Sequence, residues 1–185
     1  MSDMPCPPMF ATETMAELSA RQGRVADALR TGRVGRLRLA GCGLGDEDAL
    51  LLAMAPEPLA RLRTLDLEGN HIADEGCDAL CSAVELGLSF PRARLGDICL
   101  AENRISDRGG LRIARMLEAC TAPGVLTRLD VRSNGLGDTS ICALALATAR
   151  SPSLVEFLVA HNPYGAVGAL ALCGALERAP RLVEV

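Results

Sequence analysis

The chain has 185 residues, 49% of them hydrophobic, which is enough for one domain with a sizeable core. The hydrophobic residues are almost all aliphatic, with three Phe, one Tyr and no Trp, and this composition disfavours a pocket-bearing enzyme. The 19 basic and 23 acidic residues are mixed along the chain and give a formal net charge of −4. Nucleic acid is therefore not expected as a partner, because binding its backbone needs a positive field.

No secretory signal is expected in the N-terminal segment, because no basic region is followed by an apolar one. We expect residues 1–11 to be a flexible tail and residues 12–33 to be an N-terminal helical cap, since Thr14 and Glu17 match a capping box. The eight cysteines are then better explained by a reducing cytoplasm than by a disulfide framework. The charge-free apolar stretch at residues 165–176 is too short for a membrane span, and none is predicted.

An internal repeat dominates the rest of the chain. The pattern LxxLxLxxNxL recurs at spacings of 28 to 33 residues, and its copies start at Val34, Leu62, Leu95, Leu126 and Leu154. Apolar residues in the second half of each copy follow the i, i+3, i+4, i+7 spacing of one helix face. In the second copy these residues are Cys77, Leu80, Cys81 and Val84. Each copy therefore predicts a strand, a turn and a helix.

One strand and one helix cannot bury their apolar faces alone, so the copies must stack side by side. This predicts an α/β solenoid, with a parallel sheet backed by a row of helices. The predicted repeats are residues 34–61, 62–94, 95–125, 126–153 and 154–181, with a partial copy at 182–185. A strand in that partial copy would have an unpaired edge, which predicts self-association through the C-terminal edge strand.

Two polar positions in the repeat have expected structural roles. An Asn follows each strand, except that Cys42 takes its place in the first copy, and its amide can bond backbone groups that the turn leaves unpaired. A thiol is a weak donor, so the first repeat should be the looser end. In the first four copies an Asp stands four residues after the Asn position, where it is expected to cap the first free amides of its helix. These residues are Asp46, Asp74, Asp107 and Asp138.

These motifs resemble the ribonuclease-inhibitor-like class of leucine-rich repeats, which includes ribonuclease inhibitor, Ran GTPase-activating protein and NOD-like receptor repeats. The resemblance covers residues 34–185 and is clearest in LDLEGNHIADEGCDAL and ICLAENRISDRGGLRIARML. It implies a right-handed solenoid with a curved parallel sheet on the concave side, helices on the convex side, and a cytoplasmic protein that binds a protein partner. It transfers no family-specific functional residue, because the matching residues are the structural ones.

Three chemical constellations have simpler explanations within the repeat. Residues 41–45, GCGLG, imitate a dinucleotide-binding loop but lack its third glycine. Cys77 and Cys81 could form half of a metal site, yet they lie on the predicted core face of a helix. Cys99 falls on the predicted solvent side of its strand and is expected to be an exposed thiol, with no histidine in its own repeat to activate it. We therefore expect no catalytic residues, no cofactor and no metal.

The concave face is the remaining candidate site, because alternate strand residues point away from the core. Its predicted partner-binding residues are Arg36, Arg38, Asp66, Glu68, Asp97, Glu102, Arg128, Asp130, Arg132, Glu156 and His161. An equally open interpretation is a solvated face whose neighbouring charges pair with one another. The function predicted is a protein-interaction module or scaffold, not an enzyme. The alternatives are a regulator of a GTPase or other enzyme and a segment of a larger repeat receptor.

Overall fold

The computed structural model describes residues 35–120, 126–179 and 182. The predicted tail at 1–11, the predicted cap at 12–33 and all of the partial copy except Leu182 lie outside these residues, so those expectations stay predictions. The boundaries of the repeats also stay predictions.

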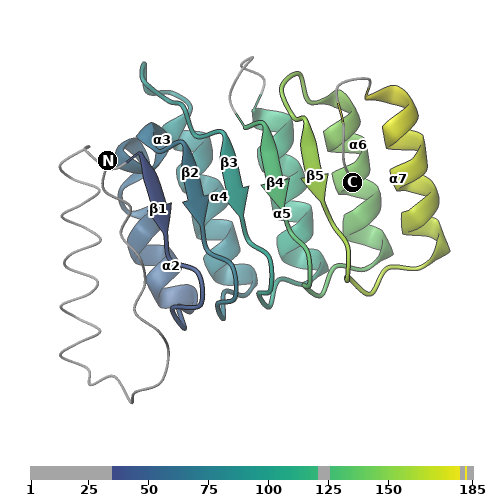
Figure 1. Cartoon of the computed structure of the whole chain (residues 1–185), viewed down its shortest axis with the longest axis horizontal. Coiled ribbons are helices and arrows are strands. Elements are labelled where there is room, and N and C mark those ends of the chain that lie inside the picture. Colours follow the sequence, from purple (N-terminus) through teal and green to yellow (C-terminus); the bar gives the residue numbers. More distant parts are fainter. Residues whose placement is uncertain (1–34, 121–125, 180–181, 183–185) are drawn as a thin grey trace.

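Five short parallel strands form one open sheet, in the order of the sequence (Figure 1). The strands are β1 (Arg36–Arg38), β2 (Thr64–Asp66), β3 (Asp97–Cys99), β4 (Arg128–Asp130) and β5 (Glu156–Leu158). Each strand pairs in register with the next, so equivalent repeat positions lie side by side.

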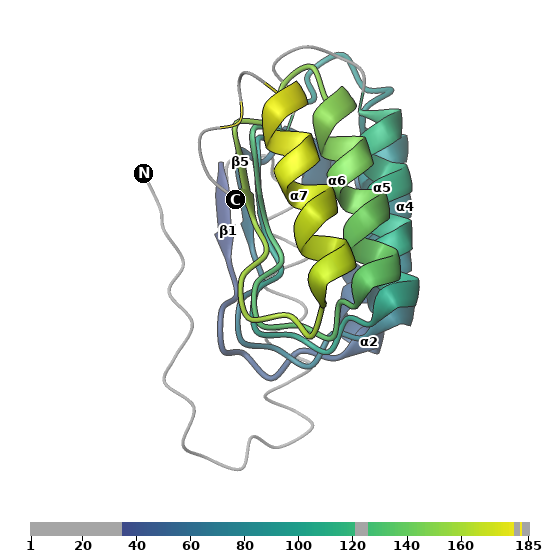
Figure 2. The ribbon, with the colours of Figure 1, turned by 90° about the vertical axis from the view of Figure 1, so that its right-hand side faces the viewer.

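The helices follow the strands along the chain and pack on one side of the sheet, as Figure 2 shows for α4 to α7. They are α2 (Asp46–Ala53), α3 (Pro56–Arg61), α4 (Asp74–Gly87), α5 (Asp107–Ala119), α6 (Asp138–Arg150) and α7 (Ala166–Arg178). The first repeat has two helices because Pro56 has no backbone N–H and begins α3 in place of continuing α2. The predicted α/β solenoid is confirmed. In the described part of the chain, no helix has both the length and the apolar character needed to cross a membrane.

The core lies between the sheet and the helices and is built from equivalent positions of successive repeats. The central residue of every strand is almost fully buried, and these residues are Leu37, Leu65, Ile98, Leu129 and Phe157. The predicted apolar stripe of the helices is buried in α4, α5 and α6. In α7 the same stripe is partly exposed, since Leu172 is buried but Cys173 and Leu176 are not. Cys173 thus differs from the buried Cys77 and Cys81.

The Asn residues form the predicted bonds to the backbone, and they also join neighbouring repeats. Asn70 donates through Nδ2 to the carbonyl oxygens of Leu39 (2.9 Å) and Leu67 (2.8 Å), which belong to different repeats. Its Oδ1 accepts from the amides of Cys42 and Leu44, both at 3.0 Å. The side chain is only 3% exposed, so water cannot replace these bonds. Bonds to the repeat before are likewise made by Asn103, Asn134 and Asn162.

The Asp residues cap helices, but the prediction that each caps its own helix was wrong. Asp46 is the first residue of α2, and its Oδ1 accepts from the amides of Ala73 (2.7 Å) and Gly76 (3.0 Å) at the start of the next helix. Asp74, Asp107 and Asp138 do the same for α5, α6 and α7. We call these four residues the Asp ladder. Each carboxylate lies closer to the neighbouring helix because stacking brings the helix starts side by side.

The close approach of the Asp ladder carboxylates explains why the third residue of α4 and of α5 is a glycine. A Cβ atom on Gly76 would lie 2.5 Å from Oδ1 of Asp46, and one on Gly109 would lie 2.6 Å from Oδ1 of Asp74. Both distances are shorter than real Cβ contacts, so a side chain at either position would displace the capping carboxylate.

Candidate functional site

The strand residues that point away from the helices form one continuous surface, which we call the sheet face. Strand pairing arranges its residues in two rows across the sheet. The first row is Arg36, Thr64, Asp97, Arg128 and Glu156. The second row is Arg38, Asp66, Cys99, Asp130 and Leu158. Among the described residues, no helix packs against this side of the sheet (Figure 2).

The predicted partner-binding residues all lie on or beside the sheet face, but their exposure differs. The exposed residues are Arg36, Arg38, Glu102 and His161. The partly exposed residues are Asp66, Glu68, Asp97, Arg128, Arg132 and Glu156. Asp130 is 1% exposed, so its carboxylate is a buried part of the face and cannot contact a partner in this conformation.

Arg128 lies at the centre of a group of ion pairs. Its Nε is 2.8 Å from Oε2 of Glu156, and its guanidinium nitrogens lie 3.6 Å from carboxylate oxygens of Asp97 and of Asp130. Burial raises the pKa of Asp97 above its ordinary value, and the charge of Arg128 opposes this shift. The positive charge of Arg128 is therefore shared by three carboxylates, one on each of the strands β3, β4 and β5.

Arg132 forms a bidentate pair with the buried carboxylate of Asp130. The distances are 2.9 Å from Nε to Oδ1 and 2.7 Å from Nη2 to Oδ2. These hydrogen bonds raise the pKa of Arg132. A fork-to-carboxylate pair of this kind holds both side chains in one orientation. Together with Arg128, it shows neighbouring charges pairing with one another on β4 and its neighbours, as the solvated-face interpretation expected.

The carboxylates of Asp66, Glu68 and Glu102 have a different environment, and we call these three residues the acidic group. Within the part of the chain that the structure describes, none of them forms an ion pair. Oδ1 of Asp66 accepts from the amide of Glu68 at 3.2 Å. The sheet face therefore divides into a self-paired region around Arg128 and the acidic group, whose carboxylates form no ion pair with the described residues.

The residue before each Asn position has a left-handed backbone. The φ angles are 54° at Glu102 and 60° at His161, and the equivalent Gly41, Gly69 and Ser133 also have positive φ. This conformation costs a non-glycine residue about 1–2 kcal/mol. The repeat pattern did not predict this conformation, although the glycines at positions 41 and 69 indicate that this turn position favours positive φ.

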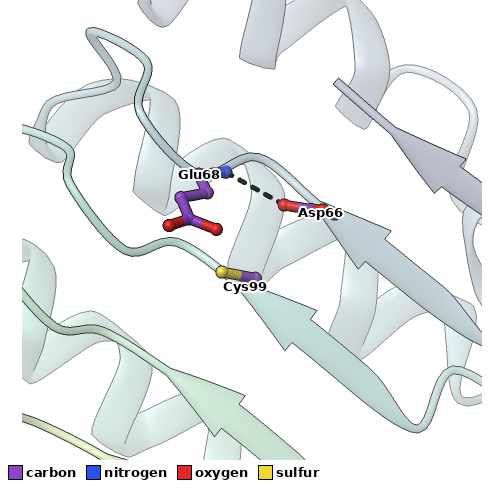
Figure 3. Close-up of side chains that lie close together, drawn as sticks. All are labelled: Asp66, Glu68 and Cys99. Carbon is purple, nitrogen blue, oxygen red and sulfur yellow. Dashed lines mark hydrogen bonds between the residues drawn. The ribbon is translucent and has the colours of Figure 1, made fainter. Parts of the chain in front are cut away.

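Cys99 lies beside Asp66 and Glu68 of the acidic group (Figure 3). The prediction that it is an exposed thiol was wrong, because the residue is 6% exposed between its neighbours on the sheet. The donor atoms of Asp66, Glu68 and Cys99 lie within 4.8 Å of one another, a spacing compatible with a metal ion. However, burial raises the pKa of the Cys99 thiol to about 12, and a thiol binds metal as its thiolate. With no further feature indicating an ion, we assign no metal to these residues.

Reasoning from the sequence placed the charged residues correctly on the face but missed which of them pair. The alternation of Arg128, Asp130 and Arg132 could have indicated this pairing, because residues two positions apart along an extended chain lie on the same face. The burial of Asp130 and Cys99 could not be inferred from alternation, because it depends on the side chains of the neighbouring strands.

Comparisons with known proteins agree with this architecture. A family model described as Leucine Rich repeat matches residues 61–81 and 125–145. The ribonuclease inhibitor of Mus musculus is 33% identical over 123 residues, which make up 65% of this chain and 25% of that protein. That of Sus scrofa is 31% identical over 147 residues, or 77% of this chain and 30% of that protein. The Tonsoku-like protein of Bos taurus is 31% identical over 130 residues, or 68% of this chain and 9% of that protein. The chain thus spans less than a third of each relative.

Proposed function

Because this chain is a leucine-rich-repeat protein of the ribonuclease-inhibitor-like class, we propose that it is a non-catalytic module that binds a protein partner on its sheet face. The family supports a protein-interaction role, and the sheet face is the surface that the fold leaves available for it. We propose that this face is concave, and that Arg36, Glu68, Glu102 and His161 are its main contact residues. Glu156 and the partly exposed Arg128 and Arg132 would contribute at the edge of the same surface.

The observation that carries this proposal is a face of the parallel sheet that no described helix covers. Parallel sheets usually have both faces covered and are apolar on both sides. Here the helices cover one face, and the other holds two rows of mostly charged residues. The acidic group keeps its carboxylates outside any ion pair among the described residues. Charges that are not paired internally are the ones that can select a partner by complementarity.

Charge reversal at exposed positions of the sheet face tests the proposal. Partners of the tagged chain are first identified by affinity purification with mass spectrometry, and their affinities are then measured with purified proteins. Glu102→Arg, combined with Arg36→Glu, should weaken binding about tenfold or more, because each reversal replaces a favourable charge contact with a repulsive one. Asp130 is unsuitable for this test, because its reversal would leave a buried charge beside Arg132 uncompensated.

The matched control reverses charges on the helix side. Glu47 and Arg115 are exposed, on α2 and α5, so Glu47→Arg combined with Arg115→Glu makes the same change in charge away from the sheet face. Its affinity should equal that of the unmodified chain. Equal binding by the sheet-face variant, or equal loss in both variants, would show that the partner does not use the sheet face.

The sequence also suggested two alternative roles, regulation of a GTPase and a segment of a larger receptor, and both remain proposals. Regulation of a GTPase by an exposed arginine would need a side chain free to reach nucleotide, and Arg128 and Arg132 are held by carboxylates. No feature of the described residues favours that alternative over partner binding. A role as one segment of a larger receptor is compatible with the short span of the relatives that the chain matches.

We also propose a reducing compartment such as the cytoplasm. Cys77, Cys81, Cys99 and Cys120 are buried free thiols in the structure, whereas Cys42 is disulfide-bonded, which counts against this proposal. A hydrogen bond with Cys77, together with burial, raises the pKa of Cys81 well above its ordinary value, so that the thiol stays protonated and unreactive.

A further inference from the structure

The outer side of α7 is an exposed apolar surface. Leu170 is 73% exposed, Val167 61% and Leu176 43%, and Ala169 and Cys173 are also exposed. We call these five residues the α7 face. No charged residue occurs in α7 before Glu177.

Part of the α7 face corresponds to positions that are buried in the inner helices. Ala169, Cys173 and Leu176 occupy the repeat positions of Cys77, Cys81 and Val84 in α4. Those three residues are buried, as are the equivalent residues Gly110, Ala114 and Leu117 of α5 and Ile141, Ala145 and Thr148 of α6. The first of these positions contacts the following helix in each case, through Cys77 and Gly109, Gly110 and Ser140, and Ile141 and Gly168. The α7 face thus continues the packing surface that joins the helices of the stack.

Two features indicate that the occupant of the α7 face is not simply another repeat. Val167 is equivalent to Glu75, Arg108 and Thr139, which stay exposed although a helix follows each of them. One more repeat would therefore leave Val167 in water. In addition, Ala166 occupies the position of the Asp ladder, so it offers no carboxylate to the helix amides of a following repeat. A following helix would lose a cap worth about 0.5–2 kcal/mol.

The α7 face matches a second copy of itself. An isologous contact brings identical residues together, so any charge at its centre would meet a like charge. The α7 face is uncharged, although the chain as a whole has a net charge of −4. We propose that two copies of this chain associate through α7, packed antiparallel about a two-fold axis near Leu170 and Cys173. This inference goes beyond the proposed function, because it uses a different surface from the sheet face.

Concentration-dependent dimerisation of the full chain tests this proposal. With one helix contributed by each copy the interface is small, so we expect a weak dimer with a dissociation constant of about micromolar. Sedimentation equilibrium over a wide concentration range should show monomer and dimer. Leu170→Glu should raise the dissociation constant at least about tenfold, because it places two negative charges at the centre of an apolar contact. Leu170 is exposed, so the variant should fold normally, which circular dichroism verifies.

The matched control is Leu86→Glu. Leu86 is on α4 and is 61% exposed, the same fraction as Val167, but it lies outside the α7 face. This variant should dimerise like the unmodified chain, whereas Val167→Glu should weaken the dimer. A monomer at every concentration would overturn the proposal and leave the face to a different occupant. A dimer insensitive to Leu170→Glu, or equally sensitive to Leu86→Glu, would overturn it as well.

Crosslinking tests the two-fold arrangement separately. A short bis-maleimide should join two chains through Cys173, the exposed thiol at the middle of the α7 face. Cys173→Ser should abolish the crosslinked dimer, and Cys142→Ser should leave it intact. Open-ended oligomers in sedimentation would show a head-to-tail contact, which contradicts the two-fold axis. None of these outcomes depends on the sheet face, so the two proposals can fail independently.

Discussion

The Asn side chains show how one residue can hold two repeats together. Each amide donates to carbonyl oxygens on both sides of a repeat boundary and accepts from amides of the repeat before. Burial decides how much these bonds matter, because a buried backbone group that loses its partner cannot turn to water. Asn70 is 3% exposed, whereas Asn162 at the other end of the array is partly exposed.

We therefore predict a graded effect of the same substitution along the array. Asn70→Ala should lower the free energy of unfolding by about 3 kcal/mol, because several buried backbone groups lose their partners. Asn162→Ala removes an equivalent set of bonds but should cost only about 1 kcal/mol, since water reaches that turn. Urea unfolding followed by circular dichroism measures both values. Equal losses at the two positions would mean that burial does not set the contribution of these bonds.

At the scale of the helix, the Asp ladder makes each helix depend on its neighbour. Two amides at the start of α6 bond Oδ1 of Asp107 in α5, at 2.8 Å from Gly137 and 3.1 Å from Ser140. Hydrogen bonds from Ser140 and Gly137 hold the pKa of the Asp107 carboxyl below its ordinary value. The ionised carboxylate is thus the form that stabilises the start of α6.

We predict that Asp107→Ala lowers the free energy of unfolding by about 2 kcal/mol at neutral pH, because α6 loses its cap. Ala166→Asp is the matched control, since it adds the same carboxylate to α7 at a position where no helix follows among the described residues. It should leave stability unchanged or raise it by less than about 1 kcal/mol through the helix dipole. Thermal and urea unfolding give both values. A loss for Ala166→Asp similar to that for Asp107→Ala would contradict capping across the repeat boundary.

The pH dependence of this pair has a defined sign. A carboxyl whose pKa is lowered by folding contributes stability above its unfolded pKa, about 3.9, and that contribution disappears as pH falls through the folded pKa. The difference in stability between the unmodified chain and Asp107→Ala should therefore be full at pH 7 and shrink progressively below about pH 4. A difference that stays constant down to the acid transition would show that the charge of Asp107 does not contribute.

For the whole molecule, stacking means that each repeat is stabilised mainly by the repeats beside it. Helix α5 packs between α4 and α6, whereas α7 packs only against α6 among the described helices. The two helices have the same length of 13 residues, so their comparison isolates the effect of the missing neighbour.

We predict that amides of α7 exchange with solvent at least about tenfold faster than those of α5, because opening α7 disrupts one interface and opening α5 disrupts two. Hydrogen exchange with mass spectrometry measures this, at a protein concentration low enough to keep the chain monomeric. Uniform protection of α5 and α7 would show that the array opens only as a single cooperative unit. At higher concentration, protection of α7 should rise if its face is buried in the dimer.

The repeat pattern was sufficient to predict the strands, the helices and their parallel stacking, because period and apolar spacing are local properties and a single strand and helix cannot bury a core alone. It also placed the charged residues of the candidate site on the sheet face, since alternation follows from strand geometry. The partners of those charges depend on distances between neighbouring strands and helices. Thus the bond of Asp46 to the next helix, the burial of Asp130 beneath Arg132 and the burial of Cys99 became evident only when the repeats were stacked in space.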